Sequence, residues 1–145
     1  MALIPPSTNA QYRGAVSSVV FLGLLTLGTI APGLIHSFVP DGGAGTIAHI
    51  DAGDKAELVR AVFAWEGATQ LALGLAMAMV VWRYRPLTPF FLLLVIVERG
   101  LMALDGWVLL PPANGHHPPE HFASLIVPPI ALVFLLLSLR PRRQA

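Results

Sequence analysis

Residues 87–107 read LTPFFLLLVIVERGLMALDGW, an apolar run followed by Glu98, Arg99 and Asp105. A helix needs about 20 residues to cross the roughly 30 Å of hydrocarbon in a bilayer, and this stretch is long enough. A charged group near the middle of a bilayer costs at least about 3 kcal/mol. The stretch therefore predicts a membrane helix whose ionisable groups have partners or water.

The composition of the whole chain agrees with this interpretation. Of its 145 residues, 55% are hydrophobic and 12% are charged, whereas a soluble domain carries about 25% charged residues. The chain has no cysteine, which excludes disulfides, thiolate nucleophiles and cysteine metal sites. We expect a single membrane domain over residues 1–145 with an uncleaved first span, and no nucleic-acid partner.

Four segments have the length and apolarity of membrane spans, namely residues 15–39, 56–82, 87–110 and 121–139. They are expected to be α-helices, because an open sheet would leave backbone groups unpaired in lipid. The turn at residues 83–86 is very short, so the second and third helices are expected to be antiparallel neighbours. The sequence thus predicts an all-α four-helix membrane bundle with up-down topology.

Basic residues are distributed unevenly about these spans. The side that bears both chain ends carries six arginines, whereas the opposite loops contain Lys55 as their only lysine or arginine. Cytoplasmic loops carry an excess of Lys and Arg, so both termini are expected in the cytoplasm. The six are Arg13, Arg83, Arg85, Arg140, Arg142 and Arg143. The other side collects Asp41, Asp51, Asp54, Glu57 and Glu120, with all five histidines on or near it.

The second and third spans share a short motif, R-x5-[DE]-G. Arg60 precedes Glu66 by six residues, and Arg99 precedes Asp105 by the same spacing. In antiparallel neighbours this spacing would bring Arg60 to Asp105 and Arg99 to Glu66. Such cross-pairing would satisfy four charges. The alternative is that these groups only fix the helix register.

Glu98 is left over by this pairing. It lies seven residues before Asp105, nearly two helical turns, so both acids point the same way. Three intramembrane acids against two arginines leave one carboxyl that is expected to hold a proton, as acid-base chemistry or proton coupling requires. Glu66, Glu98 and Asp105 are therefore the candidate catalytic residues. A neutral structural glutamate is the alternative interpretation.

Other polar and aromatic residues surround these acids. Gln70 lies one turn from Glu66 and is expected to extend its hydrogen-bond network, and His36 is expected to join the same outer polar layer. Trp65 and Trp107 are expected either to anchor the helices at the interface or to form a wall for an apolar ligand. A stripe of small residues on the second span predicts close packing against another helix. The stripe consists of Ala64, Ala68, Ala72 and Ala76.

Residues 117–121 read HPPEH, which matches the H-x-x-E-H spelling of some zinc peptidases. That motif needs both histidines on consecutive turns of one helix. Here two prolines separate them, which suits the first turn of a helix but not its interior. We therefore expect no metal site, with His117 at a helix cap and the loop histidines in solvent.

The segments LVRAVFAWEG and VERGLMALDGW resemble the small four-helix membrane proteins of the bacterial DoxX-like group. The resemblance covers about a third of the chain. It implies a four-helix bundle in a bacterial inner membrane. Because DoxX-type proteins are associated with quinone-linked redox enzymes, it also implies a quinone as the cofactor to consider. Glu98 and the His-rich outer loop depart from the group's pattern.

Three functions remain open at this point. The first is an outward-facing intramembrane pocket that binds a lipid-soluble or amphipathic molecule such as a quinone, lipid or terpenoid, with or without acid-base chemistry. The second is a proton-coupled transporter, which the absence of ionisable residues from the cytoplasmic halves of the spans argues against. The third is a non-catalytic subunit or assembly module that meets a membrane-protein partner or a second copy of itself.

Overall fold

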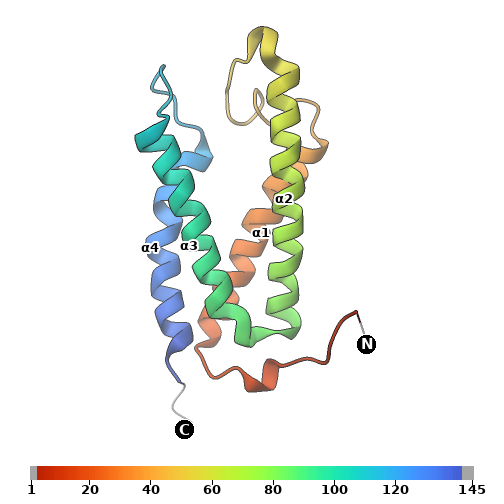
Figure 1. The fold of residues 1–145 in the computed structure, drawn as a ribbon, viewed down its shortest axis with the longest axis vertical. Coiled ribbons are helices and arrows are strands. Elements are labelled where there is room, and N and C mark those ends of the chain that lie inside the picture. The colour runs from red at the N-terminus through yellow and green to blue at the C-terminus, as the bar shows by residue number, and fades with distance from the viewer. Residues whose placement is uncertain (1–2, 142–145) are drawn as a thin grey trace.

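The computed structural model describes residues 3–141, and within that range it contains helices and no strand. Four long helices form the molecule (Figure 1): α1 Val16–Phe38, α2 Ala56–Arg83, α3 Thr88–Leu104 and α4 Pro119–Leu139. Three short 3-10 turns accompany them, η1 Asn9–Gln11, η2 Gly53–Lys55 and η3 Arg85–Leu87, and a π-helical turn, η4 Asp105–Leu109, extends α3. The four spans expected from the sequence are confirmed, with ends shifted by one or two residues apart from this π-helical turn.

All four helices, α2 and α3 taken with their flanking short turns, are long and apolar enough to cross a membrane. In the most apolar 18-residue stretch of each helix, only 17% to 33% is buried inside the molecule. The remaining apolar surface faces outward, and Leu24, Leu75 and Leu136 are all at least half exposed. Four such helices with so much exposed apolar surface indicate a multi-pass membrane protein.

The helices associate as two antiparallel pairs, α1 with α2 and α3 with α4. Figure 1 shows that α2 and α3 come together near their connection and diverge away from it. The second and third helices, which were expected to be antiparallel neighbours, are therefore in contact only near their connection. A short turn fixes where two helices start, but the side chains facing them decide which surfaces stay in contact.

Glycines determine the closest helix contact, which lies between α1 and α2. A Cβ on Gly67 would lie 2.6 Å from the Ser37 hydroxyl oxygen and 2.8 Å from the Gly33 carbonyl oxygen. A Cβ on Gly74 would collide with the Ile30 side chain. The alanines that were expected to pack against another helix do not do so within the described part of the chain, where Ala68, Ala72 and Ala76 are exposed. Glycine removes more volume than alanine, so the glycine face of α2 allows the nearest approach.

The two pairs are joined near the α2–α3 connection by an apolar core. Its buried members are Leu22 of α1, Met77 and Val80 of α2, and Leu92 and Val95 of α3. The first half of α1 also contacts α4 there, where Phe21 and Phe134 stack at 4.2 Å between ring centroids. This half of the bundle is thus closed by apolar packing.

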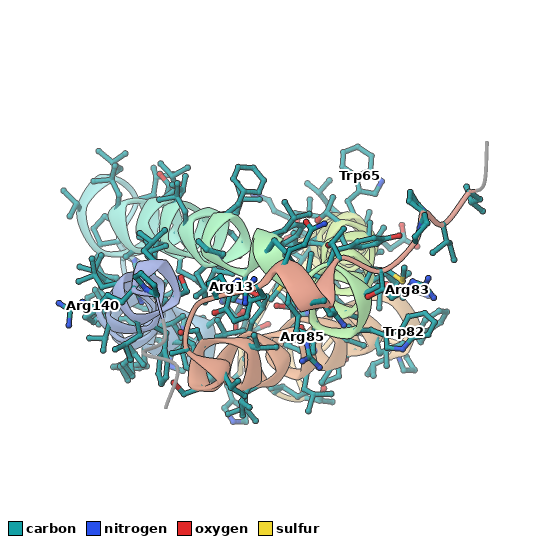
Figure 2. All side chains as sticks on the ribbon, turned by 90° about the horizontal axis from the view of Figure 1, so that it is seen from below. Arg13, Trp65, Trp82, Arg83, Arg85 and Arg140 are labelled. Atoms are coloured by element: carbon teal, nitrogen blue, oxygen red, sulfur yellow. The ribbon has the colours of Figure 1, made fainter. Side chains whose placement is uncertain are left out.

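Figure 2 views the molecule from the end that bears this core, where Arg13, Arg83, Arg85 and Arg140 gather. We call it the arginine end, and Arg142 and Arg143 lie outside the described residues. The chain before α1 is held against the α2–α3 connection by several hydrogen bonds. The Thr8 amide donates to the Arg83 carbonyl at 2.9 Å, and the Asn9 amide side chain donates to the Trp82 carbonyl at 2.6 Å.

The opposite end carries the two long loops, residues 39–52 and 110–118, and we call it the loop end. Asp41 organises the first loop by accepting hydrogen bonds from the backbone amides of Gly43, Gly45 and Thr46 at 2.7 to 3.0 Å. These bonds, those from Thr46 and Gly43 foremost, hold the pKa of the Asp41 carboxyl below its usual 3.8. The loops meet where His116 Nε2 lies 2.8 Å from the Ala48 carbonyl oxygen.

Candidate functional site

A cavity of about 360 Å³ lies at the loop end, where the two helix pairs diverge. All four helices and the first loop contribute to its wall. Its apolar lining includes Pro32 and Ile35 of α1, Ile47 of the loop, Phe63 of α2 and Met102 of α3. Its polar lining consists of His36, Glu66, Glu120 and His121. The site is thus an apolar chamber with a few ionisable groups in its wall.

Glu66 is the candidate catalytic acid that the structure places in this wall. Its Oε1 accepts a hydrogen bond from the Gln70 side-chain amide at 3.0 Å. Among residues 3–141, no other side chain or backbone donor lies within hydrogen-bonding distance of the carboxylate. Glu66 can therefore still accept hydrogen bonds.

Gln70 follows Phe63 and Glu66 on one face of α2, at helical spacing. The residue is only 5% exposed. Because its NH2 group donates to the Glu66 carboxylate, its oxygen points elsewhere, and that oxygen is buried without a partner. A buried acceptor without a donor costs about 1–3 kcal/mol in stability, and the Gln70 oxygen is such an acceptor. The expected extension of the Glu66 network to Gln70 is confirmed.

Arg99 is buried and forms its ion pair with α4. Its Nη1 donates to Glu120 Oε1 at 2.7 Å, and its Nε lies 3.9 Å from Glu98 Oε2. The Arg99 side chain is 8% exposed, against 31% for Glu120 and 32% for Glu98. The Arg99 guanidinium thus contacts two carboxylates. Glu120 on α4 is the closer one, and Glu98 on α3 is the more distant one.

The predicted cross-pairing between the second and third helices is wrong. Glu66 does not pair with Arg99, since Glu120 takes that position, and Arg60 does not pair with Asp105. Arg60 is exposed and lines a separate hollow beside the first loop. Asp105 is also exposed, at the start of the π-helical turn, and does not line the cavity. The cause is the divergence of α2 from α3, which separates their polar residues.

His36 lies in the cavity wall, as expected from its place late in α1. Its Nδ1 is 2.7 Å from the Gly42 carbonyl oxygen, which can only accept, so Nδ1 carries the proton. The ring meets Phe63 edge to face at 4.9 Å between centroids. These contacts fix the imidazole between the first loop and α2.

Trp107 belongs to an aromatic cluster between α3 and α4. Its ring stacks on His117 at 3.9 Å with an interplanar angle of 6°, and its indole N–H donates to the His121 carbonyl oxygen at 3.0 Å. His117 Nδ1 and His121 Nδ1 lie 3.0 Å apart. Gly106 packs on the His121 ring, since a Cβ there would come within 3.0 Å of it. The cluster fixes the orientation of His121, which lines the cavity.

The remaining expectations concern Trp65 and the HPPEH motif. Trp65 is 79% exposed, and Figure 2 shows it pointing away from the bundle, so it is not a cavity wall. The motif lies at the beginning of α4, with His117 just before the helix. Within residues 3–141 no group of three or more His, Asp or Glu side chains is arranged to hold a metal ion.

Sequence reasoning missed the contribution of α4. Glu120 was assigned to the outer loop as one acid among five, yet it is the partner of Arg99 and part of the cavity wall. His121 was considered only as a metal ligand. The available signal was Pro118-Pro119, which suits a helix start and therefore places Glu120 in the first turn.

No protein-family model, curated protein or solved structure matches the chain. The resemblance of LVRAVFAWEG and VERGLMALDGW to the DoxX-like group therefore stays a prediction.

Proposed function

We propose that the chain is a multi-pass protein of the bacterial inner membrane whose loop-end cavity binds a lipid-soluble or amphipathic small molecule. The single observation that supports it best is a cavity of about 360 Å³ whose wall combines apolar side chains with Glu66, His36, Glu120 and His121. Small-molecule sites are concave and mostly apolar, with a few polar groups that orient the ligand. The resemblance to the DoxX-like group is consistent with this proposal.

The proposed orientation puts the arginine end in the cytoplasm and the cavity towards the other side of the membrane. Four described arginines gather at the arginine end, whereas Asp41, Asp51 and Asp54 lie in or next to the first loop. Cytoplasmic segments carry the excess of basic residues in membrane proteins. The apolar core between the helix pairs closes the cytoplasmic half, so a ligand would enter from the outer leaflet.

If the protein also catalyses a reaction, Glu66 is the residue to which we assign proton transfer. It lines the cavity and accepts one hydrogen bond from Gln70. Of the three candidate acids, Glu66 lines the cavity and Glu98 and Asp105 do not, so Glu66 is the one placed to contact a bound molecule directly. Glu98 instead belongs to the Arg99 ion pair.

A binding experiment with a cavity-filling variant tests the proposal. Thermal unfolding of the purified protein in a non-ionic detergent would be measured with benzoquinones, lipids, terpenoids and lipophilic amines. Met102→Trp places a large ring in the cavity wall, and Leu101→Trp adds the same ring to a neighbour that is 57% exposed and outside the wall. We expect saturable stabilisation by at least one compound in the wild type and Leu101→Trp, and its loss in Met102→Trp. Stabilisation that survives Met102→Trp would contradict the proposal.

A second function, an assembly module, is supported by the exposed alanine face of α2. Ala68, Ala72 and Ala76 have no partner helix within the molecule, and small residues allow close helix approach in membranes. This function predicts indifference to every compound. It also predicts efficient cross-linking of Ala72→Cys to a neighbouring subunit in native membranes.

A further inference from the structure

The carboxylate of Glu66 in the cavity wall has acceptor positions that no described residue fills. Glu66 accepts one bond from Gln70 and none from any other described residue, and the Gln70 oxygen is buried without a donor. A carboxylate has about four acceptor positions, so most of those on Glu66 are unused. A ligand that satisfies Glu66 has to bring N–H or O–H groups.

The charges around the cavity point the same way. Glu66 and Glu120 line the cavity, and Glu98 lies nearby because it shares Arg99 with Glu120. Arg99 is the only arginine or lysine among these four residues. Arg99 is already engaged by Glu120 and Glu98. Arg60, the next basic residue on α2, is exposed beside a different hollow. Glu66 therefore lacks a cationic partner within the described part of the chain.

The apolar walls of the cavity can accommodate the apolar part of a ligand whose polar head group carries N–H or O–H donors. Pro32 and Ile35 of α1, Ile47 of the first loop and Met102 of α3 all line the cavity. Phe63 also lines the cavity, and a ring face can attract a cation that lies close to it. A carboxylate in apolar surroundings is stabilised strongly by a desolvated ammonium group.

We propose that the cavity selects lipophilic amines, molecules with a protonated amino group on an apolar body, with Glu66 as the residue that binds the ammonium group and Gln70 as the residue that positions the Glu66 carboxylate. This inference rests on the proposed ligand-binding function and specifies its ligand class. Quinones carry only acceptor oxygens, and they would leave Glu66 without a further donor.

The test compares three probes of different head chemistry on the full chain in non-ionic detergent. Octylamine carries a cation, octanol a neutral donor on the same alkyl chain, and a short-chain benzoquinone only acceptors. Affinities would be measured for the wild type, Glu66→Gln and Glu57→Gln. Glu57 is exposed at the same end and outside the cavity, so its variant controls for the loss of one negative charge.

We expect the affinity for octylamine to be at least about tenfold higher than that for octanol. Glu66→Gln should lower the affinity for octylamine about tenfold, whereas Glu57→Gln should leave this affinity unchanged. Gln70→Leu, which keeps Glu66, should weaken octylamine by a smaller factor and serves if Glu66→Gln fails to fold. Two results would overturn the assignment of amines as ligands but not the proposed binding function. One is tighter binding of octanol or the benzoquinone than of octylamine, and the other is an octylamine affinity that is unchanged in both Glu66→Gln and Gln70→Leu. Binding of no probe or other compound would overturn the proposed function itself.

Discussion

Arg99 Nη1 donates a hydrogen bond to Glu120 Oε1 at 2.7 Å, and this contact joins the middle of α3 to the first turn of α4. The guanidinium is almost fully buried, and the carboxylate lies in the cavity wall. The ion pair therefore contributes both to the packing of α3 on α4 and to the polar lining of the site.

Removing Glu120 is expected to destabilise the protein. In Glu120→Leu the buried guanidinium keeps only the more distant Glu98 as a partner. We expect a loss of about 2 kcal/mol in the free energy of unfolding, between the values for exposed and buried pairs. Unfolding by SDS titration would measure it. The double variant Arg99→Leu/Glu120→Leu should be less destabilised than the sum of the single variants, and simple additivity would contradict the coupling.

The glycine contact between α1 and α2 predicts opposite effects for two similar substitutions. Gly67→Ala places a methyl group 2.6 Å from the Ser37 hydroxyl oxygen, and overpacking of this kind costs about 1–3 kcal/mol. Gly100→Ala on α3 meets no atom within 4 Å and should stabilise that helix by up to about 1 kcal/mol. The same SDS titration separates them. Equal stability of the two variants would disprove the close contact.

Asp41 predicts a pH effect confined to the first loop. Its folded pKa is held below 3.8 by backbone amides of that loop, so its contribution to stability is complete above that pH. The contribution is lost as the pH falls through the lower folded value. Carboxyl carbon NMR of Asp41 would give its titration midpoint, and amide exchange of Thr46 should accelerate in Asp41→Ala. A midpoint at or above 3.8 would contradict the hydrogen bonds.

The proposed orientation can be tested by single cysteines, because the chain has none of its own. Asn114→Cys lies in the second long loop and Gln11→Cys at the arginine end, and both positions are exposed. In intact bacterial cells a membrane-impermeant maleimide should label Asn114→Cys at once. Gln11→Cys should be labelled only after the inner membrane is permeabilised. The reverse pattern would invert the assigned topology.

Sequence patterns predicted the helices well, because length and apolarity alone define a membrane span. The first span was placed at residues 15–39, and the structure has Val16–Phe38. The third was placed at residues 87–110, and the helical backbone there ends at Leu109 after a π-helical turn. Hydropathy carries no information about which hydrogen-bond pattern the last turn adopts.

The pairing of the helices could not be predicted in the same way. The repeated spacing around Glu66 and Arg99 suggested that α2 and α3 face each other, but the packing surface of α2 is formed by Gly67 and Gly74. The sequence analysis instead assigned the packing surface to the alanines, of which Ala68, Ala72 and Ala76 are exposed. Choosing between the two faces requires the shape of the partner helix, in particular the position of Gly33 and Ser37 on α1.

The candidate site was predicted in part. Glu66, Gln70 and His36 do lie together at or beside the cavity, because their distance along each helix gives a common depth. Arg60 and Asp105 lie at suitable depths but on other faces. Depth follows from counting residues, whereas the direction of a side chain depends on how each helix is rotated in the bundle.

The divergence of the two helix pairs has a mechanical consequence. Since the pairs meet mainly near residues 83–87, a small change of the angle between them alters the width of the cavity far more than it disturbs the core. The chain around Thr8 and Asn9 is hydrogen-bonded to this pivot from outside. Under the proposed orientation, a change in the segment around Thr8 and Asn9 on the cytoplasmic side would alter the angle between the helix pairs and with it the width of the cavity at the loop end.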